Sequence, residues 1–188
     1  MKPIELIVDE NTRLKELGFE HLRPIFNTID REREYLRKWL PFVELTKDIS
    51  FTNKFIENYL NSDKINLTFA ITYQKQFAGL IGLKDTDADN KKTEIGYWMS
   101  ERFQGNGIMT RSCKVLIDYI FSSKEINRIQ IKAATENLKS RAIPERLGFK
   151  LEGIERDGEL HSYGFVDLTV YGLLNKEFLN KSTNQPVN

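Results

Sequence analysis

RFQGNGIM, residues 102–109, joins a β-like run that ends at Met99 to a helical pattern that begins at Thr110. Two glycines one residue apart, Gly105 and Gly107, allow a tight turn and carry no Cβ atom that would keep a ligand from the backbone. Amides at the start of the following helix are then free to bind an anion, and the helix dipole adds to the attraction. The stretch predicts a phosphate-binding loop between a strand and a helix, with a plain turn and helix cap as the alternative.

Alternating hydrophobicity predicts strands on both sides of this loop. Residues 67–73, 77–83 and 93–99 form a β-hairpin and a third strand in this interpretation, and residues 128–135 alternate again after a helix over 110–121. A strand, a helix and a strand in that order make a right-handed crossover with the two strands parallel. The centre of the chain is therefore predicted as a mixed sheet.

The two ends of the chain complete this prediction. Residues 4–8 and 12–17 are β-like, and three helical segments follow: about 19–28, a second one capped by Asp30 and stopped by Pro41, and 50–60. A short helix ending at Gly148 precedes two β-like runs, 149–160 and 162–174, which are expected to pair antiparallel. The fold class is mixed α/β (α+β): a mostly antiparallel twisted sheet with helices on both faces.

Length and composition indicate one soluble domain. The chain has 188 residues, 40% hydrophobic and 29% charged, with a net charge of +1. We expect a single domain over 1–181 and a loose tail over 182–188. The small net charge argues against nucleic acid as a partner, and no apolar run reaches the roughly 20 residues that cross a bilayer.

Cysteine and histidine usage favours a cytoplasmic protein without a metal. Cys113 is the single cysteine, and the two histidines are His21 and His161. The run DTDADNKK, residues 85–92, imitates the start of a calcium loop, but it lacks the required glycine and bidentate glutamate. It is predicted to be a solvated hairpin loop.

Two motifs together resemble the GNAT acetyltransferases. The first is the Q/R-x-x-G-x-G/A pattern that starts at Arg102. The second is NLKS, residues 137–140, followed by ERLGF, residues 145–149. The chain over about 13–174 is similar to the RimJ/RimL branch, whose best-known members acetylate the N-terminal amine of ribosomal proteins.

The resemblance implies a GNAT fold that uses acetyl-CoA. Its hallmark is a splayed parallel pair, here expected between 93–99 and 128–135, where the pantetheine arm lies like an extra strand beside Asn137. The implied acetyl-CoA site consists of Met99, Arg102, Gln104, Gly105, Asn106, Gly107, Ile108, Met109, Thr110, Asn137 and Ser140.

Acetyl transfer needs a neutral amine, a site for the developing oxyanion and a proton for the leaving sulfur. The resemblance implies Ser140 as the acid, because the tyrosine that many relatives use is replaced here by Pro144. A helix cap is the structural alternative for Ser140. Glu159 is the favoured base and Glu94 its competitor, with an ordinary ion pair as the alternative for both; His161 is a third candidate.

The predicted function is acetyl transfer to a primary amine, most simply the α-amine of a protein N-terminus such as that of a ribosomal protein. Such an amine has a pKa near 8, against about 10.4 for lysine, so it asks little of its base. A small amine (a polyamine or an antibiotic) and a non-catalytic CoA-binding module are the alternatives. The acceptor groove is expected to be lined by Trp39, Tyr35 and Tyr163. A homodimer is the expected assembly.

Overall fold

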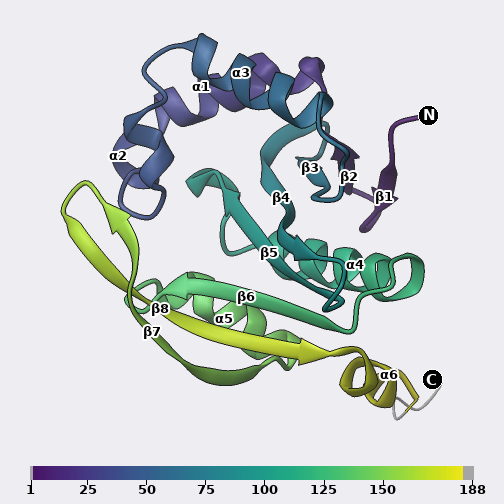
Figure 1. Cartoon of the computed structure of the whole chain (residues 1–188). Helices are drawn as coiled ribbons and strands as arrows, with labels where there is room; N and C mark the ends of the chain where they lie inside the picture. The colour runs from purple at the N-terminus through teal and green to yellow at the C-terminus, as the bar shows by residue number, and fades with distance from the viewer. Residues whose placement is uncertain (1, 184–188) are drawn as a thin grey trace.

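A computed structural model describes residues 2–183 and places eight strands of that range in one sheet, ordered β1-β2-β3-β4-β5-β6-β8-β7 (Figure 1). β5 and β6 are parallel, and the other neighbouring strands are antiparallel. The strands are β1 (Glu5–Ile7), β2 (Thr12–Glu16), β3 (Thr68–Tyr73), β4 (Gln76–Asp87), β5 (Lys92–Met99), β6 (Arg128–Ala134), β7 (Lys150–His161) and β8 (Gly164–Leu174). The expected mixed, mostly antiparallel sheet is confirmed.

Helices cover both faces of the sheet, as expected (Figure 1). The α-helices are α1 (Leu22–Arg31), α2 (Arg33–Leu36), α3 (Ile49–Leu60), α4 (Ile108–Ser123), α5 (Leu138–Leu147) and α6 (Asn175–Thr183), and single 3-10 turns are η1 (Phe19–His21), η2 (Pro41–Glu44) and η3 (Glu101–Phe103). The two faces carry separate apolar cores. One core packs α4 and α5 on the sheet through residues such as Cys113, Leu116 and Ile143. The other packs α1–α3 through Ile29, Leu36 and Ile56.

The parallel pair separates part of the way along its length. β5 and β6 are in register only from Lys92 and Arg128 to Glu94 and Gln130, although both strands continue beyond those residues. The edges of β5 and β6 that face each other beyond this point are not paired with one another. The predicted splayed parallel pair is thus present, and it opens toward the start of α4 and α5.

Three local predictions differ from the structure. Asp30 does not cap the second helix: α1 continues through it to Arg31, and Glu32 flanks the short α2. Glu32 instead accepts hydrogen bonds from Ser100 Oγ (2.8 Å) and from the Glu101 amide (2.8 Å), which ties α2 to the end of β5. α6 was not predicted. It includes residues 182 and 183 of the expected tail, whereas 184–188 lie outside the described range.

The acidic run over 85–92 contains the predicted hairpin turn, but the loop is shorter than predicted, because β5 begins at Lys92. β4 continues to Asp87, whose carboxylate accepts hydrogen bonds from the amide and side chain of Asn90 in a hairpin turn. Within residues 2–183, no cluster of three or more His, Cys, Asp or Glu side chains is arranged to hold a metal ion. None of the described helices is long and apolar enough to cross a membrane.

Candidate active site

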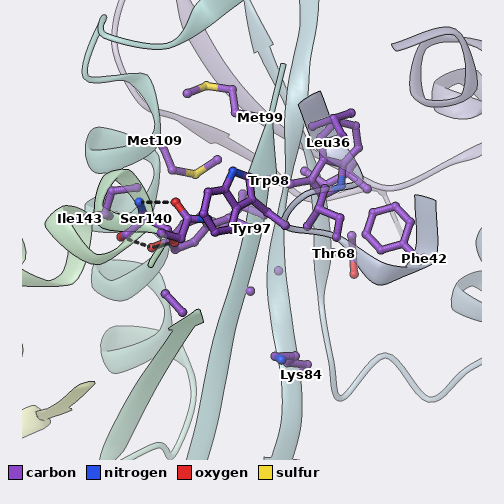
Figure 2. Close-up of a pocket in the computed structure, with 18 of the residues that line it drawn as sticks. Leu36, Phe42, Thr68, Lys84, Tyr97, Trp98, Met99, Met109, Ser140 and Ile143 are labelled. Atoms are coloured by element: carbon purple, nitrogen blue, oxygen red, sulfur yellow. Dashed lines mark hydrogen bonds between the residues drawn. The ribbon is translucent and has the colours of Figure 1, made fainter. Parts of the chain in front are cut away.

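A cavity of about 1610 Å³ reaches through the gap between β5 and β6. On one face of β5 it is lined from α4 and α5, by residues such as Met109 and Ser140. On the other face it is lined from α1–α3 and η2, by residues such as Leu36 and Phe42 (Figure 2). We call these two parts the α4–α5 lobe and the α1–α3 lobe. A ligand can therefore enter from one face of the sheet and meet a second ligand from the other.

The glycine loop lies at the mouth of the α4–α5 lobe. Gly105 (φ +78°) and Gly107 (φ +67°) both have left-handed backbone conformations, and Gly107 is the N-cap of α4. The Asn106 side chain donates to the carbonyls of Phe103 (3.2 Å) and Gln104 (3.1 Å), which braces the turn. The conformation that the sequence demands of these glycines is the one observed, and it exposes the start of a 16-residue helix to the cavity.

Most residues of the expected acetyl-CoA site line this lobe. The cavity wall contains Met99, Gln104, Gly105, Gly107, Ile108, Met109, Thr110, Asn137 and Ser140. Two expected residues lie outside the wall. Arg102 turns away to hydrogen-bond Gln76, and Asn106 serves the loop itself. Gln104 hydrogen-bonds the Tyr35 hydroxyl of α2 and accepts from Lys139 of α5 (3.0 Å), so its side chain bridges the cavity mouth.

Asn137 and Ser140 begin α5 beside the end of β5. Asn137 is the helix N-cap and accepts a hydrogen bond from the Ser140 amide (3.2 Å), so the cap is Asn137 and not Ser140. The Ser140 hydroxyl donates to the Tyr97 hydroxyl (3.3 Å), which in turn donates to the Ser140 carbonyl (3.0 Å) (Figure 2). Burial raises the pKa of Tyr97, which therefore keeps its proton at neutral pH.

Glu94 faces the α1–α3 lobe and is already paired. Its carboxylate lies 2.8 Å from Lys84 Nζ, and its side chain is only 7% exposed. The two residues are register partners on neighbouring strands β4 and β5. The Lys84 ammonium therefore already occupies Oε1 of the Glu94 carboxylate. The ion pair foreseen as the structural alternative is thus the observed arrangement for Glu94.

Glu159 also lines the cavity, from the end of β7. Its side chain is 41% exposed, and Oε2 lies 2.8 Å from Nε2 of His161, whose side chain is fully buried. His161 Nδ1 has no hydrogen-bond partner among the described residues. The Tyr163 ring is tilted by 46° against the His161 ring, with 5.2 Å between their centroids. Its hydroxyl donates to the Lys38 carbonyl (2.9 Å), which connects the β7–β8 hairpin to the segment after α2.

Two features of the site were not predicted. Tyr97 belongs by alternation with Ile95 and Met99 on the core face of β5, and that pattern carries no hint of a contact with α5. His161, the third candidate base, pairs with Gly164 at the end of β7, and the burial of its ring was not predicted. The expected acceptor walls Trp39 and Tyr35 do line the cavity, whereas Tyr163 closes the hairpin beside it.

The loop, the splayed strands and the cavity that crosses them define an acyl-transfer enzyme of the acetyltransferase class. The acetyltransferase (GNAT) domain model matches residues 11–150. The chain is 35% identical to the putative ribosomal N-acetyltransferase YdaF of Bacillus subtilis, over 91% of this chain and 95% of that protein. It is 28% identical to the ribosomal-protein-serine acetyltransferase of Escherichia coli, over 87% and 93%.

A solved structure agrees with these relatives. The microcin C7 self immunity acetyltransferase MccE, in complex with acetyl-CoA and AMP, is 28% identical and superposes with a TM-score of 0.85 over 89% of this chain and 94% of that one. The chain therefore belongs to the GNAT acetyltransferase family. The expected enzyme class, an acetyl-CoA-dependent N-acetyltransferase, is confirmed.

Proposed function

We propose that this chain transfers an acetyl group from acetyl-CoA to the α-amine of a protein N-terminus, with a serine-initiated ribosomal protein as the acceptor. The observation that carries the proposal is the cavity itself: it joins the glycine loop to a second lobe on the other face of the sheet, so donor and acceptor can bind together. Two relatives that match most of the chain's length carry ribosomal acceptors in their names. A cytoplasmic, homodimeric enzyme fits this role.

Acetyl-CoA supplies an activated thioester to the site. The residues that fit it are Gly105 and Gly107, with amides at the start of α4 for the pyrophosphate. The unpaired edges of β5 and β6 suit the amides of a pantetheine arm. Asn137 stands beside this edge, although its side-chain oxygen already caps α5.

Glu159 is proposed as the base that receives the proton of the acceptor amine. Its carboxylate is partly exposed to the cavity, and only one oxygen accepts a hydrogen bond from His161. Glu94, in contrast, is buried and neutralised by Lys84 at 2.8 Å. An acceptor amine reaches the partly exposed carboxylate of Glu159 more readily than the buried and paired carboxylate of Glu94, so the geometry favours Glu159.

Ser140 is proposed as the group that delivers a proton to the leaving sulfur. Its hydroxyl lines the cavity at the point where β5 and β6 have separated. Tyr97 positions this hydroxyl through the 3.3 Å hydrogen bond and is itself anchored on the Ser140 carbonyl. Pro144 of α5 has no hydroxyl group, but the Tyr97 phenol of β5 lies beside Ser140.

The proposal is tested by following thiol release from acetyl-CoA with serine-initiated peptides, spermidine and aminoglycosides as competing acceptors. We expect the peptides to have the highest kcat/KM. Glu159→Gln and Ser140→Ala should each lower kcat by roughly 10²-fold, as loss of a general base or acid does, with little change in acetyl-CoA affinity. Full activity in both variants contradicts these roles, and a preference for a small amine contradicts the acceptor.

A further inference from the structure

The floor of the α1–α3 lobe has side chains at its two ends and none in its middle. Three successive register pairs of β4 and β5 form this floor: Leu80 with Trp98, Gly82 with Gly96, and Lys84 with Glu94. All six residues line the cavity. Because side chains alternate along a strand, the three pairs lie on one face of the sheet. The glycine pair therefore leaves a hollow between an apolar pair and an ion pair.

The two glycines of the hollow differ in what the fold requires. A Cβ atom on Gly82 would lie 2.6 Å from the Leu67 carbonyl oxygen, so the neighbouring backbone excludes any side chain there. A Cβ on Gly96 would meet only the alkyl carbons of Lys84, at 3.6 Å, which is ordinary contact. Glycine inside a strand weakens it, and it commonly marks the close approach of a ligand. The protein's own packing therefore leaves room for a Cβ at Gly96.

The wall above this floor is aromatic and carries one unsatisfied polar group. Phe51 and Phe55 of α3 remain 36% and 39% exposed and line the cavity, although their helical spacing predicts core positions. Trp39 and Phe42 extend the same wall. Thr52, between the two phenylalanines, is 2% exposed, and its hydroxyl has no hydrogen-bond partner among the described residues. Such a wall suits a peptide, which has both apolar side chains for the aromatic rings and polar backbone groups for the Thr52 hydroxyl.

The charges of this lobe do not select a polycation. Lys54, Lys84 and Lys132 line the cavity there, and the carboxylates that line the cavity are those of Glu94, Glu101 and Glu159. Glu94 is already paired with Lys84, and Lys132 pairs with Glu155 at 2.6 Å. The cavity therefore has no excess of carboxylates that an acceptor with several ammonium groups would need. A peptide N-terminus brings one amine and needs one carboxylate.

We propose that the hollow at Gly82 and Gly96 binds a bulky apolar side chain at the second residue of the acceptor peptide. The inference rests on the proposed function, because it places the reactive amine at Glu159 and the following side chain against the aromatic wall. Selectivity then arises from the missing Cβ at residue 96: a methyl group there occupies the space that the acceptor side chain needs.

The test compares two peptides that differ only in their second residue, Ser-Phe and Ser-Gly, with the full-length protein and its Gly96→Ala variant. We expect the wild type to prefer Ser-Phe. The added methyl should lower kcat/KM for Ser-Phe roughly tenfold or more and change Ser-Gly by less than about twofold. Gly18→Ala is the matched control, since its Cβ meets only the flexible end of Glu20 and Gly18 is not part of the cavity wall.

Acetyl-CoA affinity, measured by calorimetry, should stay unchanged in Gly96→Ala, which shows that the variant is folded and that the donor site is intact. Phe55→Ala provides a second variant, and it should reduce the same Ser-Phe preference. An equal loss with both peptides, or no loss with either, overturns the hollow as a subsite. A wild-type protein that binds acetyl-CoA but acetylates neither peptide overturns the proposed function instead.

Discussion

The hydrogen bond between His161 and Glu159 indicates which nitrogen of a buried imidazole carries the proton. Nδ1 has no partner among the described residues, and the side chain has no exposed surface. The tautomer protonated on Nδ1 would bury an N–H without a partner and turn a lone pair toward the carboxylate, whereas the tautomer protonated on Nε2 leaves only a lone pair unpartnered. The second tautomer costs less. It makes Nε2 the donor to Glu159 and leaves the other carboxylate oxygen for the acceptor amine.

His161 is therefore predicted to act on the reaction through Glu159. His161→Phe removes the donor and should lower kcat about tenfold, in keeping with roughly 1.5–3 kcal/mol for a hydrogen bond to a charged group. His161→Gln keeps an N–H of similar reach and should recover most of that loss. Steady-state kinetics decide the matter: equal kcat in the two variants, or an effect confined to the KM for acetyl-CoA, would contradict a positioning role.

At the scale of single elements, the loop before α4 combines a backbone requirement with a binding role. Gly105 has φ +78°, and a Cβ there would meet no atom of the protein within 4 Å. Gly148, which ends α5, has a nearly identical φ of +77° but does not line the cavity. The two positions therefore share the left-handed backbone that penalises a side chain, and Gly105, unlike Gly148, borders the cavity.

This difference allows a matched pair of substitutions. Gly105→Ala and Gly148→Ala should each lose about 1–2 kcal/mol of unfolding free energy, the cost of left-handed backbone for a residue with a Cβ. Gly105→Ala alone should also raise the KM for acetyl-CoA about tenfold, because its methyl group points into the donor site. Urea unfolding and initial rates measure the two effects separately. An unchanged KM in Gly105→Ala would remove the loop from the donor site.

The elements also show why sequence patterns succeed in some places and fail in others. The strands and α4 could be predicted because alternation and helical spacing follow directly from which face is buried. The start of α2 could not be predicted, because it depends on Glu32, which accepts hydrogen bonds from Ser100 and Glu101 at the distant end of β5. The spacing of residues 50–60 predicts the helix correctly and puts Phe51, Phe55, Ile56 and Tyr59 on one face. Ile56 and Tyr59 of this face are buried in a core, whereas Phe51 and Phe55 line the cavity.

The candidate site follows the same division. Ser140, Glu94 and Glu159 were identified from motifs, and all three line the cavity. The pairing of Glu94 with Lys84 and the contact of Ser140 with Tyr97 depend on register and on helix packing, which a single sequence does not specify. Their roles in catalysis stay predictions.

At the scale of the whole molecule, Glu16 connects the edge of the sheet to α3. Its carboxylate accepts hydrogen bonds from the Ile4 amide (2.8 Å), Tyr59 Oη (3.1 Å) and Lys64 Nζ (2.7 Å). Burial alone would raise the pKa of Glu16, but these donors, Lys64 first among them, outweigh it and hold the pKa below its ordinary value. The ionised carboxylate therefore stabilises the arrangement of β1, β2 and α3 on which the α1–α3 lobe is built.

The sign of the resulting pH dependence follows from linkage. Because the pKa of Glu16 is lower in the folded chain, its contribution is complete above the unfolded pKa of about 4.3 and is lost as the pH falls through the folded value. Glu16→Gln should therefore cost about 1–3 kcal/mol of unfolding free energy at pH 7. Thermal unfolding should show this difference between wild type and variant shrinking below about pH 4. Glu5→Gln, an exposed change on the neighbouring β1, should show no such convergence. A Glu16→Gln penalty that stays constant down to pH 3 would mean that lost packing, and not the charge, links the sheet edge to α3.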